Sequence, residues 1–249
     1  MFNVGKGKME PRELILSLTE HFSAQISQAS TPRELNKIFK GARFKFEQLK
    51  KDSLSFPNNE TVCVTGCAYC CYLTVTLRAH EIVQILEFIN TKLTKTEIAN
   101  IINRAKINMK QMLQLTHDEC EHTNFKCPLL SDDGLCMCYE ARPFSCQKFN
   151  SRDADLCRLF YENPKANISQ DSAYGVDMSA AVVLYSLADA FKNNGYDENV
   201  YYLNHALYEG LINPKMIKRW RKKKKAFSKN ALSKETKKFP INELSLPDD

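Results

Sequence analysis

Four cysteines lie within the nine residues 63–71, and the other six lie between residues 120 and 157. Cysteines that only fill a core are scattered singly through a fold, so this grouping needs another cause. Thiols separated by two or three residues are typical of the ligands of a soft metal ion or an iron–sulfur cluster. The clustering therefore predicts a protein whose loops are tied together by bonds between thiolates and a metal.

A disulfide framework is the alternative explanation, and the even number of cysteines, ten, leaves it open. Disulfide scaffolds are typical of small secreted domains, whereas this chain has 249 residues and 43% hydrophobic residues, enough to bury a core. The first twenty residues carry several charges and no apolar stretch, which predicts no secretory signal. No apolar segment is long enough to predict a membrane span. We therefore expect a cytoplasmic protein with free or metal-bound thiols.

Apolar residues recur at helical spacing over much of the chain, which predicts a mainly α fold. A helix is expected to begin after Thr31, because Thr31, Pro32 and Glu34 match a capping box with proline at the first helical position. Thr94 and Glu97 predict a second capped start. Helices are expected over residues 11–28, 31–52, 78–92, 94–115, 172–193 and 198–209, and from residue 214 into a basic run.

The same pattern suggests how the chain is organised. Residues 1–57 are predicted to form a helical hairpin, and residues 58–165 a cysteine-rich metal-binding region of loops held between helices. Residues 166–226 are expected to form helices that pack on the same core. Residues 227–249 are expected to form a flexible tail, first basic and then acidic.

The spacing within the first cysteine group favours metal binding. Cys67 and Cys70 are three residues apart, the interval at which two thiolates converge on one ion, and Cys63 lies four residues before Cys67. Cys70 and Cys71 are adjacent, so their side chains diverge and are not expected to bind one tetrahedral ion together. They either face two metals, or one binds while the other packs.

No complete tetrahedral set is evident in this first group, so the second group is expected to contribute ligands. Cys127, Cys136 and Cys146 follow at intervals of nine and ten residues, in loops that can fold back. Arg142 and other nearby cations could balance the charge of several thiolates. No role is assigned to Cys120 or Cys138. The predicted ligands are Cys63, Cys67, Cys70, Cys71, Cys127, Cys136, Cys146 and Cys157.

Together these residues form a longer pattern. It runs Cys63-x3-Cys67-x2-Cys70-Cys71, Leu77-x3-Glu81, Cys127-Pro128-Leu129-Leu130 and Cys136-x2-Tyr139-Glu140-x-Arg142-Pro143-x2-Cys146-x2-Phe149. The pattern resembles the YkgJ-like cysteine-cluster family, to which zinc or iron chelation is ascribed. Flagellin lysine N-methylases carry a similar cluster, and that resemblance implies an iron–sulfur centre. The x3 gap after Cys63 departs from the family, where many members have x2, and Cys138 stands at a usually apolar place.

The histidines give weaker evidence of a site than the cysteines do, and no phosphate-binding motif is found. His80, beside Glu81, could be a ligand or a base, but a lone histidine opening an amphipathic helix is expected to be a surface residue. His117 and His122 flank a polar cluster that could bind a metal adventitiously. The sequence contains no G-x-G-x-x-G and no Walker A loop, so it predicts no conventional nucleotide-binding domain.

The net charge of +6 arises largely from a basic run that begins at Lys218 and ends at Lys225, with Trp220 inside it. Such a run could contact nucleic acid or an acidic membrane surface, or it could be a solvated end of the chain. No recognised nucleic-acid-binding fold surrounds it, so nucleic acid is the weaker expectation.

Three functions compete at this stage. The first is an iron–sulfur or iron protein with a redox or catalytic role. The second is a zinc-stabilised binding module that engages an unknown protein partner or substrate through a helical face or the basic run. The third is a protein-modifying enzyme similar to the lysine N-methylases. Thiolates accept both iron and zinc, so the sequence does not choose the metal.

Overall fold

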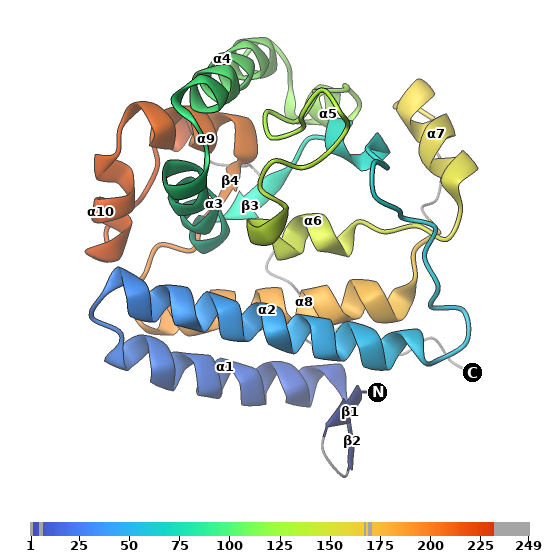
Figure 1. Cartoon of the computed structure of the whole chain (residues 1–249), viewed down its shortest axis with the longest axis vertical. Helices are drawn as coiled ribbons and strands as arrows, with labels where there is room; N and C mark the ends of the chain where they lie inside the picture. Colours follow the sequence, from blue (N-terminus) through green and yellow to red (C-terminus); the bar gives the residue numbers. More distant parts are fainter. Residues whose placement is uncertain (1, 5–6, 167, 169–170, 232–249) are drawn as a thin grey trace.

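The computed structural model describes residues 2–4, 7–166, 168 and 171–231. Figure 1 shows a mainly helical molecule, as the sequence predicts. The strands are the hairpin β1 (Phe2–Val4) and β2 (Gly7–Met9), and the antiparallel pair β3 (Thr76–Arg78) and β4 (Val200–Tyr202). The helices are α1 (Pro11–Gln28), α2 (Pro32–Leu54), η1 (Tyr69–Tyr72), α3 (Ala79–Lys92), α4 (Lys95–Met112), α5 (His117–Glu121), η2 (Tyr139–Ala141), α6 (Phe144–Lys148), α7 (Ala154–Glu162), α8 (Tyr174–Asn193), α9 (Leu203–Ile212), α10 (Lys215–Arg221) and η3 (Lys229–Ala231). No helix among these described residues is long and apolar enough to cross a membrane.

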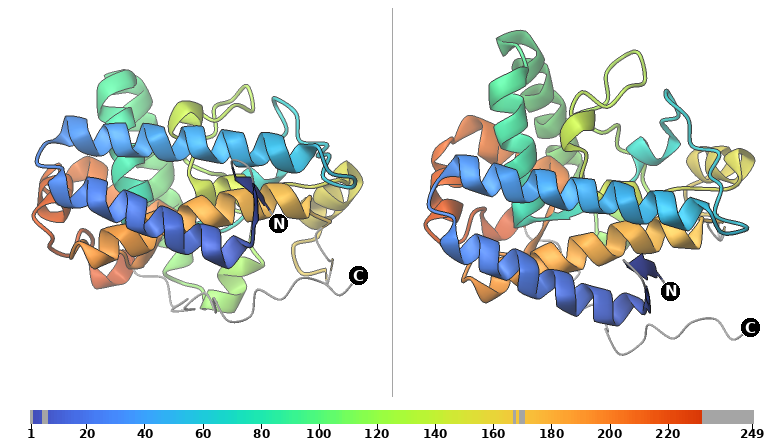
Figure 2. Two further views of the ribbon diagram at one scale, coloured as in Figure 1. Left: turned by 90° about the horizontal axis from the view of Figure 1, so that it is seen from below. Right: turned by 60° about the horizontal axis from the view of Figure 1, so that its bottom comes forward.

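Three long helices, α1, α2 and α8, form one layer of the molecule. Both α1 and α2 pack mainly on α8 and much less on each other. Figure 2 shows α8 behind and between α1 and α2. The predicted apolar stripes of α1 and α2 are all buried in this layer. Both capping boxes predicted from the sequence are confirmed, at Thr31 with Glu34 and at Thr94 with Glu97.

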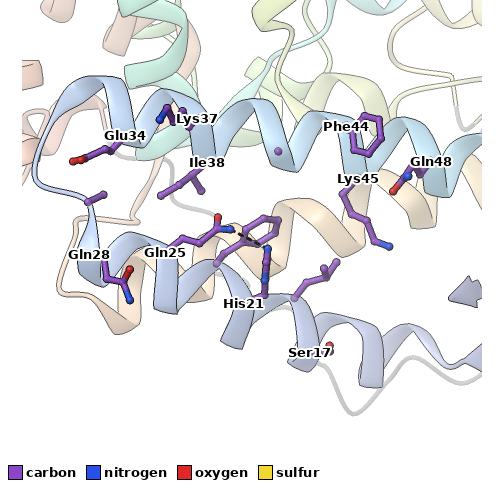
Figure 3. Close-up of a pocket in the computed structure, with 14 residues that line it drawn as sticks. Ser17, His21, Gln25, Gln28, Glu34, Lys37, Ile38, Phe44, Lys45 and Gln48 are labelled. Carbon is purple, nitrogen blue, oxygen red and sulfur yellow. Dashed lines mark hydrogen bonds between the residues drawn. The ribbon is translucent and has the colours of Figure 1, made fainter. Parts of the chain in front are cut away.

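Because α1 and α2 touch little, a groove of about 790 Å³ lies between them. His21 and Gln25 of α1 extend into it, with Nε2 of each 3.1 Å apart, and Phe44 and Lys45 of α2 line the other side (Figure 3). Gly41 sits in this groove with no atom within 4 Å of where a Cβ would stand.

The second layer surrounds the β3–β4 pair, in which Leu77 is opposite Tyr201. Helix α9 packs on α3 and α4, and α10 packs on α9 and α3. The helix predicted from residue 198 begins only at Leu203, because residues 200–202 pair with β3 instead. Leu203 N–H then donates to the carbonyl of Val75, 2.9 Å away.

The basic run is part of the fold, although its lysine side chains are exposed. It forms α10 and the turn after it, and Trp220 is fully buried, with its indole N–H donating to the carbonyl of Asp197 at 2.9 Å. Ala226 and Phe227 are buried as well, so the chain from residue 227 begins as part of the core. Residues 232–249, the rest of the predicted tail, lie outside the described residues.

Candidate metal centre

The first cysteine group lies on a loop that leads into the short helix η1. Cys67 N–H donates to the carbonyl of Val64 at 3.0 Å, and Gly66 takes a φ of +87°, a left-handed conformation that glycine adopts without strain. Cys63 and Cys67 are exposed on this loop, while Cys70 and Cys71 in η1 are half-buried. The turn therefore presents thiols both at the surface and toward the protein.

Backbone hydrogen bonds tie the second cysteine group to the first. Cys127 N–H donates to the carbonyl of Cys71, and Phe125 N–H to that of Tyr72, both at 2.8 Å. Beyond Cys127 the chain folds back, and Leu130 and Cys136 form an isolated antiparallel bridge. This arrangement brings Cys127 and Cys136 next to η1, although about sixty residues separate the two groups in sequence.

The next cysteine, Cys146, is positioned by three polar side chains. It lies in α6, whose Ser145 donates its backbone N–H and its hydroxyl to the buried carboxylate of Glu81, at 3.0 and 2.7 Å. The guanidinium of Arg142 donates to the carbonyl of Cys146 at 2.9 Å. Arg43 of α2 in turn donates to the carbonyl of Arg142 at 2.7 Å. Helices α2 and α3 thus fix the loop that carries Cys146.

Cys157 approaches the first group from α7. Tyr161, one helical turn after Cys157, packs against Tyr69 and Tyr72 of η1, with ring centroids 5.8 and 4.8 Å apart. Side chains four residues apart share a helix face, so Cys157 also lies on the side facing η1. In Figure 1, α7 stands beside the segment that leads into η1, well away from α1.

The electrostatic influence of each thiol on the others shows which are neighbours. The pKa of Cys67 is raised by burial and by the negative charges of Cys63, Cys70 and Cys157. Burial, together with the charges of Cys136 and Cys70, raises the pKa of Cys127 to about 12. We name Cys63, Cys67 and Cys157 the outer set, and Cys70, Cys127, Cys136 and Cys146 the inner set. Cys70 belongs to the inner set but also adjoins the outer one.

Arg142 is the cation of the inner set. It opposes the effect of burial on the pKa values of Cys136 and Cys146, and the nearby thiolates of Cys146, Cys70 and Cys136 raise the pKa of Arg142 itself. The pKa of Cys70 is raised, first by its hydrogen bond to Cys71 and then by burial. The inner thiols are therefore protonated at neutral pH without a metal, and a metal must displace those protons to bind.

All ten cysteines are free thiols. Within the described residues, no three Cys, His, Asp or Glu side chains already surround a point where a single ion would fit. The donor chemistry nevertheless fits a soft metal, because several thiols and one guanidinium meet in a partly buried site. The fold brings the predicted ligands into two adjoining sets without closing a shell around one ion.

Two cysteines without an assigned role belong to the core. Cys138 is fully buried in the main core, and Cys120 packs with Met112 and Phe125 in a smaller apolar cluster. Cys138 nevertheless adjoins the inner set, since burial and then the charges of Cys136 and Cys127 raise its pKa. Their burial explains their presence as small apolar side chains.

The side chains of His80, His117 and His122 form hydrogen bonds with groups other than the cysteine thiols. The prediction that His80 lies on the surface is wrong, because its ring is buried between Phe39 and Phe191, and its Nδ1 lies 2.6 Å from the Glu198 carboxylate. Glu198 is 118 residues away in sequence, so no local signal could reveal this pair. His117 Nδ1 bonds the hydroxyl of Tyr202 at 2.6 Å, and His122 bonds the backbone of its own helix.

Ser145 and Arg43 are residues of the site that the sequence did not single out. Ser145 has a sequence signal only in its position next to Cys146, and Arg43 lies on α2, a hundred residues earlier. Their roles become visible only when the fold places them.

Comparison with known proteins agrees with this geometry. Residues 62–172 match the CxxCxxCC family model, described as "Putative zinc- or iron-chelating domain". The match covers somewhat less than half of the chain and includes all ten cysteines. No curated protein and no solved structure matches the chain. The match supports metal binding as the general role of this region, whereas the YkgJ-like resemblance and the relation to the methylases stay predictions.

Proposed function

We propose that residues 62–172 hold an iron–sulfur cluster on the inner set, Cys70, Cys127, Cys136 and Cys146. Four cysteine thiolates are the usual ligands of such clusters. The carrying observation is that these four thiols adjoin one another around Arg142. Four thiols in one partly buried site match the number of ligands that such a cluster takes.

The protein's own residues have defined tasks in this proposal. Arg142 provides positive charge next to the thiolates, which would otherwise leave net negative charge in a partly buried site. The carboxylate of Glu81 holds Ser145, and with it the backbone of Cys146, in place. When bound, the cluster would supply one-electron chemistry or a structural link between loops.

The outer set, Cys63, Cys67 and Cys157, is more exposed and offers three thiols rather than four. Cys71 adjoins the inner set, because it is hydrogen-bonded to Cys70 and its charge raises the pKa of Arg142. We propose that the three cysteines of the outer set form a second, more accessible thiol site, so that the eight predicted ligands serve more than one metal. Sites with three protein ligands leave a coordination position open to water or substrate.

The test is metal analysis of the full chain purified without oxygen, together with its visible absorption spectrum. We expect about two to four irons per chain, with acid-labile sulfide and a brown colour. Cys127→Ser should remove the colour, whereas Cys120→Ala, which changes a cysteine of the core, should keep it. Colourless protein with stoichiometric zinc and no iron would overturn the cluster.

A structural zinc centre is the second candidate. The observation that favours it is that α7, which carries Cys157, has no buried residue, so apolar packing contributes little to holding it. Structural zinc sites supply folding energy directly. In that case, chelation of zinc should release α7 and the loops from the helical layers, as measured by limited proteolysis. Unchanged protease resistance after complete removal of the metal would contradict a structural role.

A further inference from the structure

A second concave site lies where the two layers meet, near the ends of α8, α10 and β3. A cavity of about 390 Å³ is lined by four cations, Arg78, Lys192, Lys223 and Lys225. They come from separate parts of the chain, since Arg78 ends β3, Lys192 lies in the last turn of α8, and the other two follow α10. This volume is in the lower part of the range found for small-molecule sites.

The carboxylates in the lining do not neutralise these lysines. Asp197 accepts hydrogen bonds from the hydroxyl of Tyr201 at 2.6 Å, from the N–H of Ala226 at 2.8 Å and from Asn199. Glu198 is held by His80. Among the described residues, Lys192, Lys223 and Lys225 form no ion pair. Asp197 keeps its negative charge and Glu198 is paired with His80, so the four cations leave an excess of positive charge in the lining that attracts an anion.

The backbone directs one of these lysines to the cavity at a cost. Lys223 has a φ of +59°, a left-handed conformation that side chains other than glycine rarely adopt. Its N–H donates to the carbonyl of Trp220 at 2.8 Å, and its ammonium lies 5.4 Å from the ring centroid of Tyr196, which also lines the cavity. Lys223 directly follows the C-cap of α10, a position that glycine usually occupies, so glycine would be easier to accommodate there.

One buried polar atom in the lining also has no partner. Glu198 lines the cavity, and its Oε1 is buried without a hydrogen bond among the described residues. Its other oxygen is held by His80, at 2.6 Å. A buried carboxylate oxygen without a donor is uncommon and costly.

We propose that this cavity binds a small ligand with a phosphate-type oxyanion. Arg78 offers a planar guanidinium and the lysines offer point charges, the two kinds of side chain that bind phosphate. An extended nucleic acid fits less well, because the basic run is not a continuous stripe: Trp220 is in the core, and Arg221 is paired with Glu87. This site is separate from the thiol sets and does not depend on the metal.

Binding can be followed by the intrinsic fluorescence of Trp220. Trp220 is the only tryptophan in the sequence, and its ring centroid lies 4.7 Å from that of Tyr196. Inorganic phosphate should therefore change the fluorescence of the full chain in a saturable way, when ionic strength is held constant with chloride. Titration with glycerol 3-phosphate in parallel distinguishes free phosphate from a phosphate ester, and tighter binding of the ester would indicate a small organic ligand.

Two variants make the test specific. Lys223→Gly removes the side chain but suits the positive φ, so the melting temperature should not fall while phosphate affinity falls at least tenfold. Lys224→Ala removes the same charge one residue later, outside the lining, and should change affinity less than twofold. The proposal is wrong if phosphate has no saturable effect beyond chloride, or if both variants lose affinity equally. It is also wrong if a short single-stranded RNA binds more tightly than either phosphate and both variants weaken it alike.

Discussion

The layer of α1, α2 and α8 and the cysteine loops of residues 62–172 are held in different ways. In the helical layer, every residue of the predicted stripes of α1 and α2 is buried. Around the cysteine loops, apolar side chains such as Val64 and Tyr139 are 72% and 69% exposed. The first region is specified by burial of apolar surface. The second combines a few buried anchors in its loops, such as Leu129 and Phe144, with hydrogen bonds between the loops that carry thiols.

This difference indicates which region of the molecule a bound metal would stabilise. Removing apolar contacts from the helical layer should lower the stability of the whole molecule. Removing a metal from the loops should instead loosen them while the helices remain, because the long helices have their own core. The experiments below either separate the two regions or show that they unfold together.

The largest effect is expected from the inner thiols. Changing Cys127 and Cys146 to serine together should abolish tight metal binding, because serine hydroxyls do not replace thiolates for a soft metal. Limited proteolysis should then cut within residues 62–172, while the far-UV circular dichroism of the long helices stays close to that of the unchanged protein. Cys120→Ala is the control, since Cys120 lies in an apolar cluster. Loss of all helical signal in the double variant would show that the two regions are not separable.

The next effect concerns apolar packing, at the contact between α9 and α3 and on α2 of the helical layer. A Cβ on Gly210 of α9 would stand 2.3 Å from Cδ1 of Leu86, which is fully buried. Gly210→Ala should therefore lower the free energy of unfolding by about 1–3 kcal/mol, as overpacking does. Gly41→Ala on α2 meets open space and should raise it by about 0.5–1 kcal/mol. Urea unfolding measures both. A change in metal content in Gly41→Ala would contradict the independence of the helical layer from the cysteine loops.

The same contrast explains how much could be predicted from the sequence. Helices with a regular apolar period and a capping box, such as those after Thr31 and Thr94, were predicted closely, because their signals are local. The eight ligands could be proposed from spacing and resemblance, and they stay a prediction. Their division into two sets could not, because it depends on the pairing of Cys127 with Cys71 across the fold.

The failures have the same cause. His80 was expected at the surface because its local pattern is that of a helix start, but Glu198 and two aromatic rings enclose it from distant parts of the chain. Trp220 stood in a run of charges, yet it fills the core between Phe191 and Tyr196. A single large apolar residue in a charged segment is itself a signal of burial, and it outweighs the charge of its neighbours.

A smaller effect is expected where the two regions meet. The carboxylate of Glu81 on α3 accepts from Ser145 N–H, from the Ser145 hydroxyl and from Arg78 N–H, at 3.0, 2.7 and 3.2 Å. Glu81→Gln keeps the shape but loses one acceptor, so Cys146 is held less firmly and metal affinity should fall about tenfold. Competition with a chelator measures this. Glu140→Gln, at an exposed carboxylate in the same loops, should leave affinity unchanged, and equal losses in both variants would point to net charge rather than positioning.

The smallest effect concerns the capped start of α2. Hydrogen bonds from the N–H groups of Ser30 and Thr31, at 2.8 and 2.9 Å, lower the pKa of Glu34 from 4.5 to about 2. A depressed carboxylate pKa stabilises the fold above pH 4.5, and this contribution is lost as the pH falls toward about 2. Glu34→Gln should therefore lower the melting temperature slightly at neutral pH, with the difference from the unchanged protein shrinking across that window. Glu20→Gln, at an exposed carboxylate of α1, should show no such trend. A difference for Glu34→Gln that is independent of pH would indicate that the capping box acts through shape rather than charge.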